Sequence, residues 1–95
     1  MAKKEDYQEK TEAQLNELEA QIEILRAKAH QATAEAKPEC YARLAVLDTK
    51  REVARVRLQT MAVVGEEAWE NLKGSVEHAL SDLESALNIA APRFE

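Results

Sequence analysis

The chain has 95 residues with one Trp, one Phe and two Tyr, so it can enclose no more than one small hydrophobic core. Apolar side chains make up 45% and charged ones 33%, with two Gly and two Pro, a composition typical of long helices and coiled coils. The net charge of −5 arises in residues 65–95, which carry seven acidic and two basic side chains, and such an acidic segment argues against nucleic-acid binding.

The first predicted element is a helix over residues 7–36. Asp6 and Glu9 have the spacing of a capping box, which favours a start near Tyr7, and a start one turn earlier, over residues 3–6, is the alternative. Seven apolar residues then recur with alternating spacings of three and four, the heptad pattern of a coiled-coil helix. They are Leu15, Leu18, Ile22, Leu25, Ala29, Ala32 and Ala36.

A turn is expected at residues 37–38, because the residue before Pro38 is pushed out of helical geometry. A second helix is predicted over residues 39–64, with a matching heptad series. Its members are Cys40, Leu44, Leu47, Arg51, Ala54, Leu58 and Met61. The two series together predict an antiparallel coiled-coil hairpin.

The hairpin also has a predicted register. Facing residues of antiparallel helices have numbers with a constant sum, and a sum of 76 aligns the two heptad series. Three of the resulting layers place a large side chain opposite Ala, which fills a narrow gap evenly. The same register brings Glu19 near Arg55, Arg26 near Asp48 and Glu35 near Arg43.

Beyond Gly65 the apolar residues follow an eleven-residue repeat, which predicts helical structure over residues 66–90, ended by Pro92. Gly65 has no Ser, Asp, Asn or Pro beside it, whereas chain reversals usually contain such residues. We therefore favour a long second arm that continues past Gly65. A reversal at this point, giving a three-helix bundle, is the alternative.

The first helix covers the second arm only to about residue 73, so the apolar side chains beyond need another helix. A second apolar stripe, away from the seam, comprises Ile24, Val46, Val53, Val56 and Val63. We predict that two or more hairpins associate into a helical bundle. The expected interface residues are Arg51, Val53, Val56, Val63, Trp69, Leu72, Val76, Leu80, Leu83 and Leu87.

Two residues of the second helix bear on association and reactivity. Arg51 stands in the seam opposite Leu25, where it either fixes the register and association state or covers apolar surface with its stem. Cys40 stands opposite Ala36 and is expected to fill a small buried space. A redox or metal-binding thiol near His30 is the alternative reading of Cys40.

No catalytic, cofactor-binding or metal-binding residues are predicted. His78 and Glu67 share a helix face eleven residues apart, but a Glu-x-x-His pair of the di-iron type is missing, so a solvated acidic face is expected. A narrow hairpin offers no pocket in which a nucleophile and a base could be held together. We therefore do not expect an enzyme.

The single Cys excludes an internal disulfide and favours a reducing compartment. No apolar run approaches the ~20 residues that span a bilayer, and the polar residues 1–6 do not begin a signal peptide. A soluble, cytoplasmic protein is therefore expected, and membrane binding is not favoured.

The order of features resembles that of small bacterial coiled-coil proteins of uncharacterised function. The resemblance is carried by Lys3-Lys4-Glu5, the seam over residues 15–36 and the motif Ala68-Trp69-Glu70-Asn71-Leu72-Lys73. The resemblance implies a helical fold, and no activity is carried over from it. We expect an oligomeric coiled-coil module with a structural or protein-interaction role, bound to further copies of itself or to another protein. The alternative is an apolipoprotein-like or stress-protective binder of lipid surfaces that acts through residues 66–91.

Overall fold

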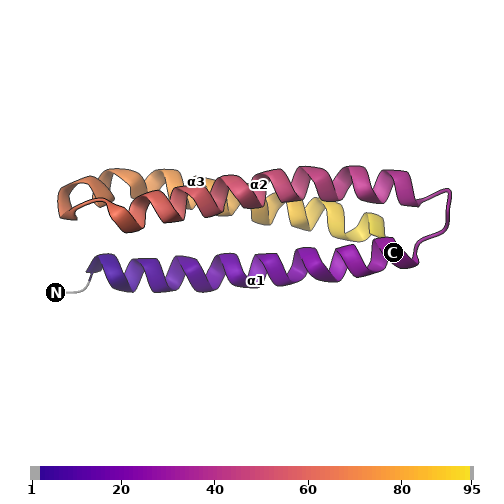
Figure 1. Ribbon diagram of the computed structural model, residues 1–95, viewed down its shortest axis with the longest axis horizontal. Coiled ribbons are helices and arrows are strands. Elements are labelled where there is room, and N and C mark those ends of the chain that lie inside the picture. Colours follow the sequence, from indigo (N-terminus) through magenta and orange to yellow (C-terminus); the bar gives the residue numbers. More distant parts are fainter. Residues whose placement is uncertain (1–2, 95) are drawn as a thin grey trace.

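A computed structural model describes residues 3–94 and shows a bundle of three antiparallel helices over this range (Figure 1). Helix α1 spans Lys3–Gln31, α2 spans Lys37–Val63 and α3 spans Glu66–Ala90, with the 3-10 helix η1 over Ala91–Phe94. The bundle measures 52 × 18 × 16 Å, so the helices lie side by side along one long axis. The predicted all-α helical bundle is confirmed.

The first two helices form the predicted hairpin with two of its three predicted cross-helix pairs, whereas Arg43 pairs with Glu39 of its own helix instead of Glu35. Arg26 Nη2 lies 2.7 Å from Asp48 Oδ1, and Arg55 Nη2 lies 2.8 Å from Glu19 Oε1. The heptad residues that this register aligns are buried, apart from Arg51 and the two alanines that follow the end of α1. Apolar layers along α1 and α2 therefore hold the hairpin together.

The chain reverses direction at Gly65, so the prediction of one continuous second arm is wrong and the three-helix alternative is observed. Val64 (φ −91°, ψ 161°) and Gly65 (φ −77°, ψ 178°) are both extended, and these two residues connect α2 to α3. The Lys4 ammonium donates hydrogen bonds to the carbonyl oxygens of Ala62 (3.2 Å) and Val64, at the end of α2. A contact from α1 thus supports the reversal that no local turn residue marks.

Helix α1 begins at Lys3, which agrees with the alternative start and lies about a turn before the favoured start near Tyr7. Side chains of this additional turn contact the opposite part of the chain: Lys4 reaches the end of α2, and the Tyr7 ring packs against Trp69 of α3. These contacts hold the first turn in helical form beyond the position that the capping-box spacing indicated.

The connection between α1 and α2 covers residues 32–36, whereas the sequence predicted a turn at 37–38 and a first helix that reaches residue 36. Within the connection, the Thr33 hydroxyl accepts a hydrogen bond from the Ala36 N–H at 3.2 Å. Pro38 lies in the first turn of α2, where its missing N–H leaves no helical hydrogen bond unmade. The break that proline indicated therefore occurs one turn earlier in the chain.

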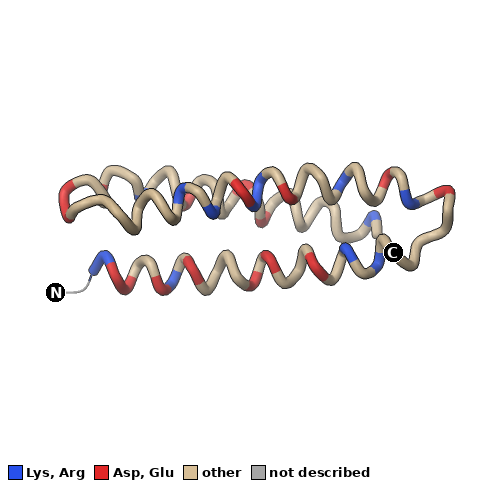
Figure 2. Tube along the Cα trace, viewed as in Figure 1, with Lys and Arg blue, Asp and Glu red and all other residues tan. Residues whose placement is uncertain are grey.

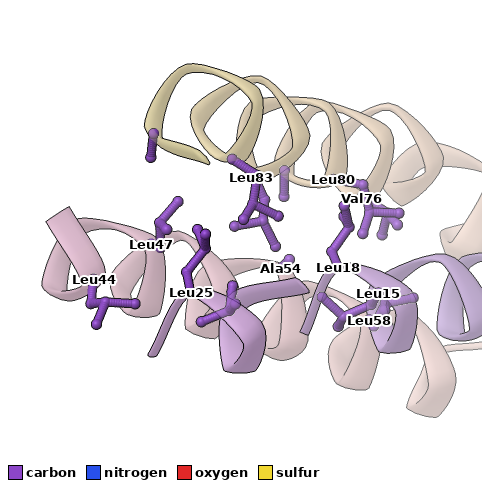
Figure 3. Packing of buried hydrophobic residues seen from close by; sticks show 14 of the residues in the cluster. Leu15, Leu18, Leu25, Leu44, Leu47, Ala54, Leu58, Val76, Leu80 and Leu83 are labelled. Carbon is purple, nitrogen blue, oxygen red and sulfur yellow. The ribbon is translucent and has the colours of Figure 1, made fainter. Parts of the chain in front are cut away.

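Helix α3 packs its apolar side against both α1 and α2 (Figure 3). The figure shows Val76, Leu80 and Leu83 directed toward the hairpin, and each is at most 2% exposed. Leu87 is buried in the same way. These are the side chains that the hairpin alone would leave uncovered, so the cover that they need comes from their own chain.

Charged residues occur along all three long helices (Figure 2), and the side chains of several join one helix to another. Arg55 of α2 contacts Glu12 of α1 at 2.5 Å, and Lys50 of α2 contacts Asp82 of α3 at 2.8 Å. The hydrogen bond from Lys50 and its positive charge lower the pKa of the Asp82 carboxyl below its ordinary value. Water screens exposed pairs of this kind, so the apolar layers contribute most of the stability.

Candidate interaction surface

The outer side of α2 carries a row of β-branched side chains, which we call the α2 outer stripe. Its members are Val46, Thr49, Val53, Val56, Thr60 and Val63. They are spaced alternately by three and four residues, so the stripe is a second heptad seam, on the side of α2 away from the core. The four Val side chains are 40–84% exposed. Within residues 3–94, no helix covers this seam.

The two threonines of the α2 outer stripe satisfy their hydroxyl groups within their own helix. Thr49 Oγ1 donates to the carbonyl oxygen of Ala45 at 3.0 Å, and Thr60 Oγ1 donates to that of Val56 at 2.9 Å. The Thr methyl groups are then available for apolar contact, so the stripe is apolar over its whole length. At 1.5 Å per residue this length is about 26 Å.

A shallow hollow lies on the middle of the α2 outer stripe. It is lined by Thr49, Glu52, Val53 and Val56, together with neighbouring polar side chains of α2. These four residues have the spacing of the four side chains that surround one knob in coiled-coil packing. The surface is therefore shaped to receive a side chain from another helix.

Charges flank the α2 outer stripe unequally. Glu52 lies on one flank beside the paired Asp48 and Arg51, and Lys50 and Arg57 lie on the other. Lys50 is paired with Asp82, whereas Arg57 donates to the neutral backbone carbonyl of Ser75 at 3.1 Å. Within the described range, Glu52 makes no ion pair. The stripe therefore has a negative charge on one flank and a positive charge on the other, neither of them in a direct ion pair.

Apart from Arg51, the predicted interface residues fall into two groups in the structure. One group lies between α3 and the hairpin and comprises Trp69, Val76, Leu80, Leu83 and Leu87, with the half-buried Leu72 packed against them. The other group lies on the α2 outer stripe and comprises Val53, Val56 and Val63. Because the chain reverses at Gly65, the first group is covered by its own chain and does not need a second copy.

Sequence reasoning missed Thr49 and Thr60 and placed Ile24 wrongly. The two threonines continue the three-and-four spacing of the valines, and that spacing is the signal that could have found them. Ile24 is 57% exposed but lies in a different hollow, where α1 meets Leu87 of α3 and Ala91 of η1. It is therefore not part of the α2 outer stripe.

Arg51 bends away from the seam toward the outside of the bundle. Its Nη2 lies 3.8 Å from Asp48 Oδ1, its side chain is about one-third exposed, and its Nε is buried without a hydrogen-bond partner. The stem thus covers apolar surface while the guanidinium borders the hollow on the α2 outer stripe. Its predicted role in fixing the association state stays a prediction.

Tyr7 of α1 and Trp69 of α3 close the end of the bundle at which α2 turns into α3. Their ring centroids are 5.7 Å apart, and the Lys73 ammonium lies 5.2 Å from each ring. The Trp69 indole N–H donates to the Glu66 carboxylate at 3.3 Å. Trp69, one of the predicted interface residues, therefore lies between the third helix and the hairpin.

Stability is expected to fall at alkaline pH partly because of Tyr7. Burial and the hydrogen bond to Glu77 (3.0 Å) raise the pKa of the Tyr7 hydroxyl above its ordinary value. The folded state therefore keeps this proton after the unfolded state has lost it, so the contribution is complete below about pH 10 and is lost as the pH rises further. Urea unfolding from neutral to alkaline pH measures this loss.

The variant Tyr7→Phe is the control for this prediction, since it keeps the ring and removes the ionisable group. It should lose less stability between neutral and alkaline pH than the natural chain. Equal losses in the two proteins would show that Tyr7 does not couple folding to pH in this way.

Cys40 is free and buried, which confirms its expected place as a small core side chain. His30, which could have assisted a reactive thiol, has its Nδ1 2.8 Å from the Tyr41 hydroxyl. In residues 3–94, no group of three or more His, Cys, Asp or Glu side chains is placed to hold a metal ion. The bundle therefore presents the α2 outer stripe as its candidate functional surface.

The apolar side of α3 is the surface that lipid binding would use. Its large side chains are buried against α1 and α2, so a lipid surface could reach them only if the helices separated. None of the described helices has a stretch long and apolar enough to cross a membrane.

Comparisons of the chain with protein-family models, with curated proteins and with solved structures found no match. The fold and the surface together define a small antiparallel three-helix bundle with one uncovered heptad seam.

Proposed function

We propose that the chain is a structural or protein-interaction module that works as a self-associated assembly of three-helix bundles. The observation that carries the proposal is the α2 outer stripe, a heptad seam that no helix covers within residues 3–94. Single exposed aliphatic residues are ordinary on protein surfaces, but a continuous row along one helix favours another helix as its partner. Association would remove this row from water.

The charge of the chain supports a protein partner over an anionic one. The acidic excess lies in residues 65–95, so α3 repels nucleic acid and anionic head groups. The free thiol of Cys40 supports a reducing, cytoplasmic location as part of the same proposal. Kinship with small bacterial coiled-coil proteins also belongs to the proposal and rests on the motif around Trp69.

Sedimentation equilibrium tests this function. The natural chain should show a mass above 10.7 kDa that increases with protein concentration. The variant Val56→Lys places a charge in the middle of the stripe and should sediment as a monomer, because association would bury an unpaired ammonium group.

Ile24→Lys is the matched control, since Ile24 is also an exposed aliphatic residue but lies outside the α2 outer stripe. Its mass should equal that of the natural chain. A natural chain that sediments at 10.7 kDa up to high micromolar concentrations would contradict the proposed function.

A further inference from the structure

We infer that the α2 outer stripe binds the same stripe of a second copy, with the two α2 helices parallel and in register. This inference rests on the proposed function and adds the orientation of the two bundles and the residues that meet. Most of the stripe lies on the side of α2 away from α1 and α3 and is exposed, and only its Val46 end borders α3, where it lines a hollow with Ala86, Ile89 and Ala90.

The side chains of the α2 outer stripe suit a pair of helices. Val46, Val53 and Thr60 occupy the first of the two seam positions in each heptad, and all three are β-branched. β-branched residues at this position suit parallel coiled coils, and the β-branched Thr49, Val56 and Val63 at the second position allow assemblies of two or more strands, so the orientation rests on the flanking charges. In a parallel pair, each residue of the stripe faces its own equivalent, which gives a series of small apolar layers.

The hollow on the stripe fits this arrangement. A seam side chain of one helix packs between four residues of the facing helix in a parallel coiled coil. Thr49, Glu52, Val53 and Val56 surround the hollow, and Val53 of the second copy is the side chain that parallel pairing directs into it. Val53 of the first copy enters the hollow of the second copy in the same way, because the two copies are related by a two-fold axis.

The flanking charges distinguish parallel from antiparallel pairing. In a parallel pair, opposite flanks meet, and Glu52 of one copy lies beside Arg57 of the second copy, five residues further along. Because the pair of bundles has two-fold symmetry, this ion pair occurs twice. These are the charged groups of the flanks that lack a direct ion-pair partner within the bundle.

In an antiparallel pair, each flank meets the same flank of the second copy. Arg57 would then approach Lys50, which is a like charge, and Glu52 would approach the uncharged Gln59. Antiparallel pairing therefore makes no attractive ion pair along the stripe, whereas parallel pairing makes two. The charges thus favour the parallel orientation.

Cross-linking through single cysteines tests the orientation. In the Cys40→Ala background, Val46→Cys and Val63→Cys each place one thiol near one end of the stripe. In a parallel pair, each variant alone should form a disulfide-linked dimer under a mild oxidant, because the residue faces its equivalent at a distance that a disulfide can span. In an antiparallel pair, equivalent thiols would be about 26 Å apart.

The outcomes separate the inference from the proposed function. Dimers formed by each variant alone support parallel pairing. A dimer that forms only when the two variants are mixed shows antiparallel pairing, and an associated chain that forms no disulfide in either experiment shows a different interface; both results overturn the inference and leave the proposed function standing. A monomeric natural chain overturns both.

A charge exchange tests the contact between Glu52 and Arg57. The variant Glu52→Arg should raise the dissociation constant about tenfold, because two attractive pairs become repulsive. Mixing it with Arg57→Glu should restore association, since the charges again complement each other. Glu17→Arg, on the exposed side of α1, makes the same change of charge and should have no effect. An unchanged dissociation constant for Glu52→Arg would exclude this contact.

Discussion

Replacement of Leu83 by Ala is expected to lower the free energy of unfolding by about 2–5 kcal/mol. Leu83 is fully buried between α3 and the hairpin, so the variant loses apolar contact and leaves a cavity that the surrounding helices cannot fill completely. A loss of this size is a large part of the stability of a small domain. Urea unfolding followed by circular dichroism measures it.

The matched control for Leu83→Ala is Ile89→Ala on the same helix. Ile89 is 69% exposed, so its truncation should change the free energy of unfolding by no more than about 0.5 kcal/mol. The loss for Leu83→Ala should be the same at low and high protein concentration, because its burial comes from its own chain. A loss that appears only at high concentration would show that α3 packs against another copy instead.

Replacement of Trp69 by Ala is expected to cost about 3–5 kcal/mol. The indole is 3% exposed, and it joins α3 to the first turns of α1 through the Tyr7 ring. Trp69→Phe keeps an aromatic ring at this point and should cost less. Because the substitution removes the intrinsic fluorophore, unfolding is followed by circular dichroism.

A double-mutant cycle tests the contact between Trp69 and Tyr7 directly. The costs of Trp69→Ala and Tyr7→Ala should not add, and the coupling energy expected for a packed aromatic pair is about 0.5–1.5 kcal/mol. Simple additivity would show that the two rings act independently and that the ends of α1 and α3 are not joined through them.

The hairpin of α1 and α2 could be predicted because its information is local and periodic. A heptad series identifies which side of each helix is buried, and only one register pairs all seven members of one series with all seven of the other. The cross-helix pairs of Arg26 and Arg55 are consequences of that register. A periodic pattern of this kind survives small errors in the helix bounds, which were misplaced by about one turn.

The reversal at Gly65 could not be predicted in this way. Its two connecting residues are extended, and neither adopts a positive φ that would require Gly or Asn. No particular residue type is needed there, so the sequence has no turn signal. The hydrogen bonds that support the connection come from Lys4, almost sixty residues earlier, and a local reading cannot include them.

The candidate surface was only partly visible in the sequence. The valines of the stripe indicate a second apolar face, but Thr49 and Thr60 carry hydroxyl groups, so their residue type alone does not assign them to it. Their hydroxyl bonds to the helix backbone are needed to show that the seam continues through them. The buried leucines of α3 were assigned to an interface between chains because the reversal that covers them was not expected.

The direction of the chain through the described bundle has a consequence for anything attached to it. Residues 3–94 form an odd number of long helices, so Lys3 and Phe94 lie at opposite ends of the rod (Figure 1). A hairpin would return to the end from which it started. Segments fused before Lys3 and after Phe94 would instead be held apart at the two ends of a rigid rod up to 52 Å long. In the parallel pair, the equivalent fused segments of the two copies would lie next to each other at the same end of the rod.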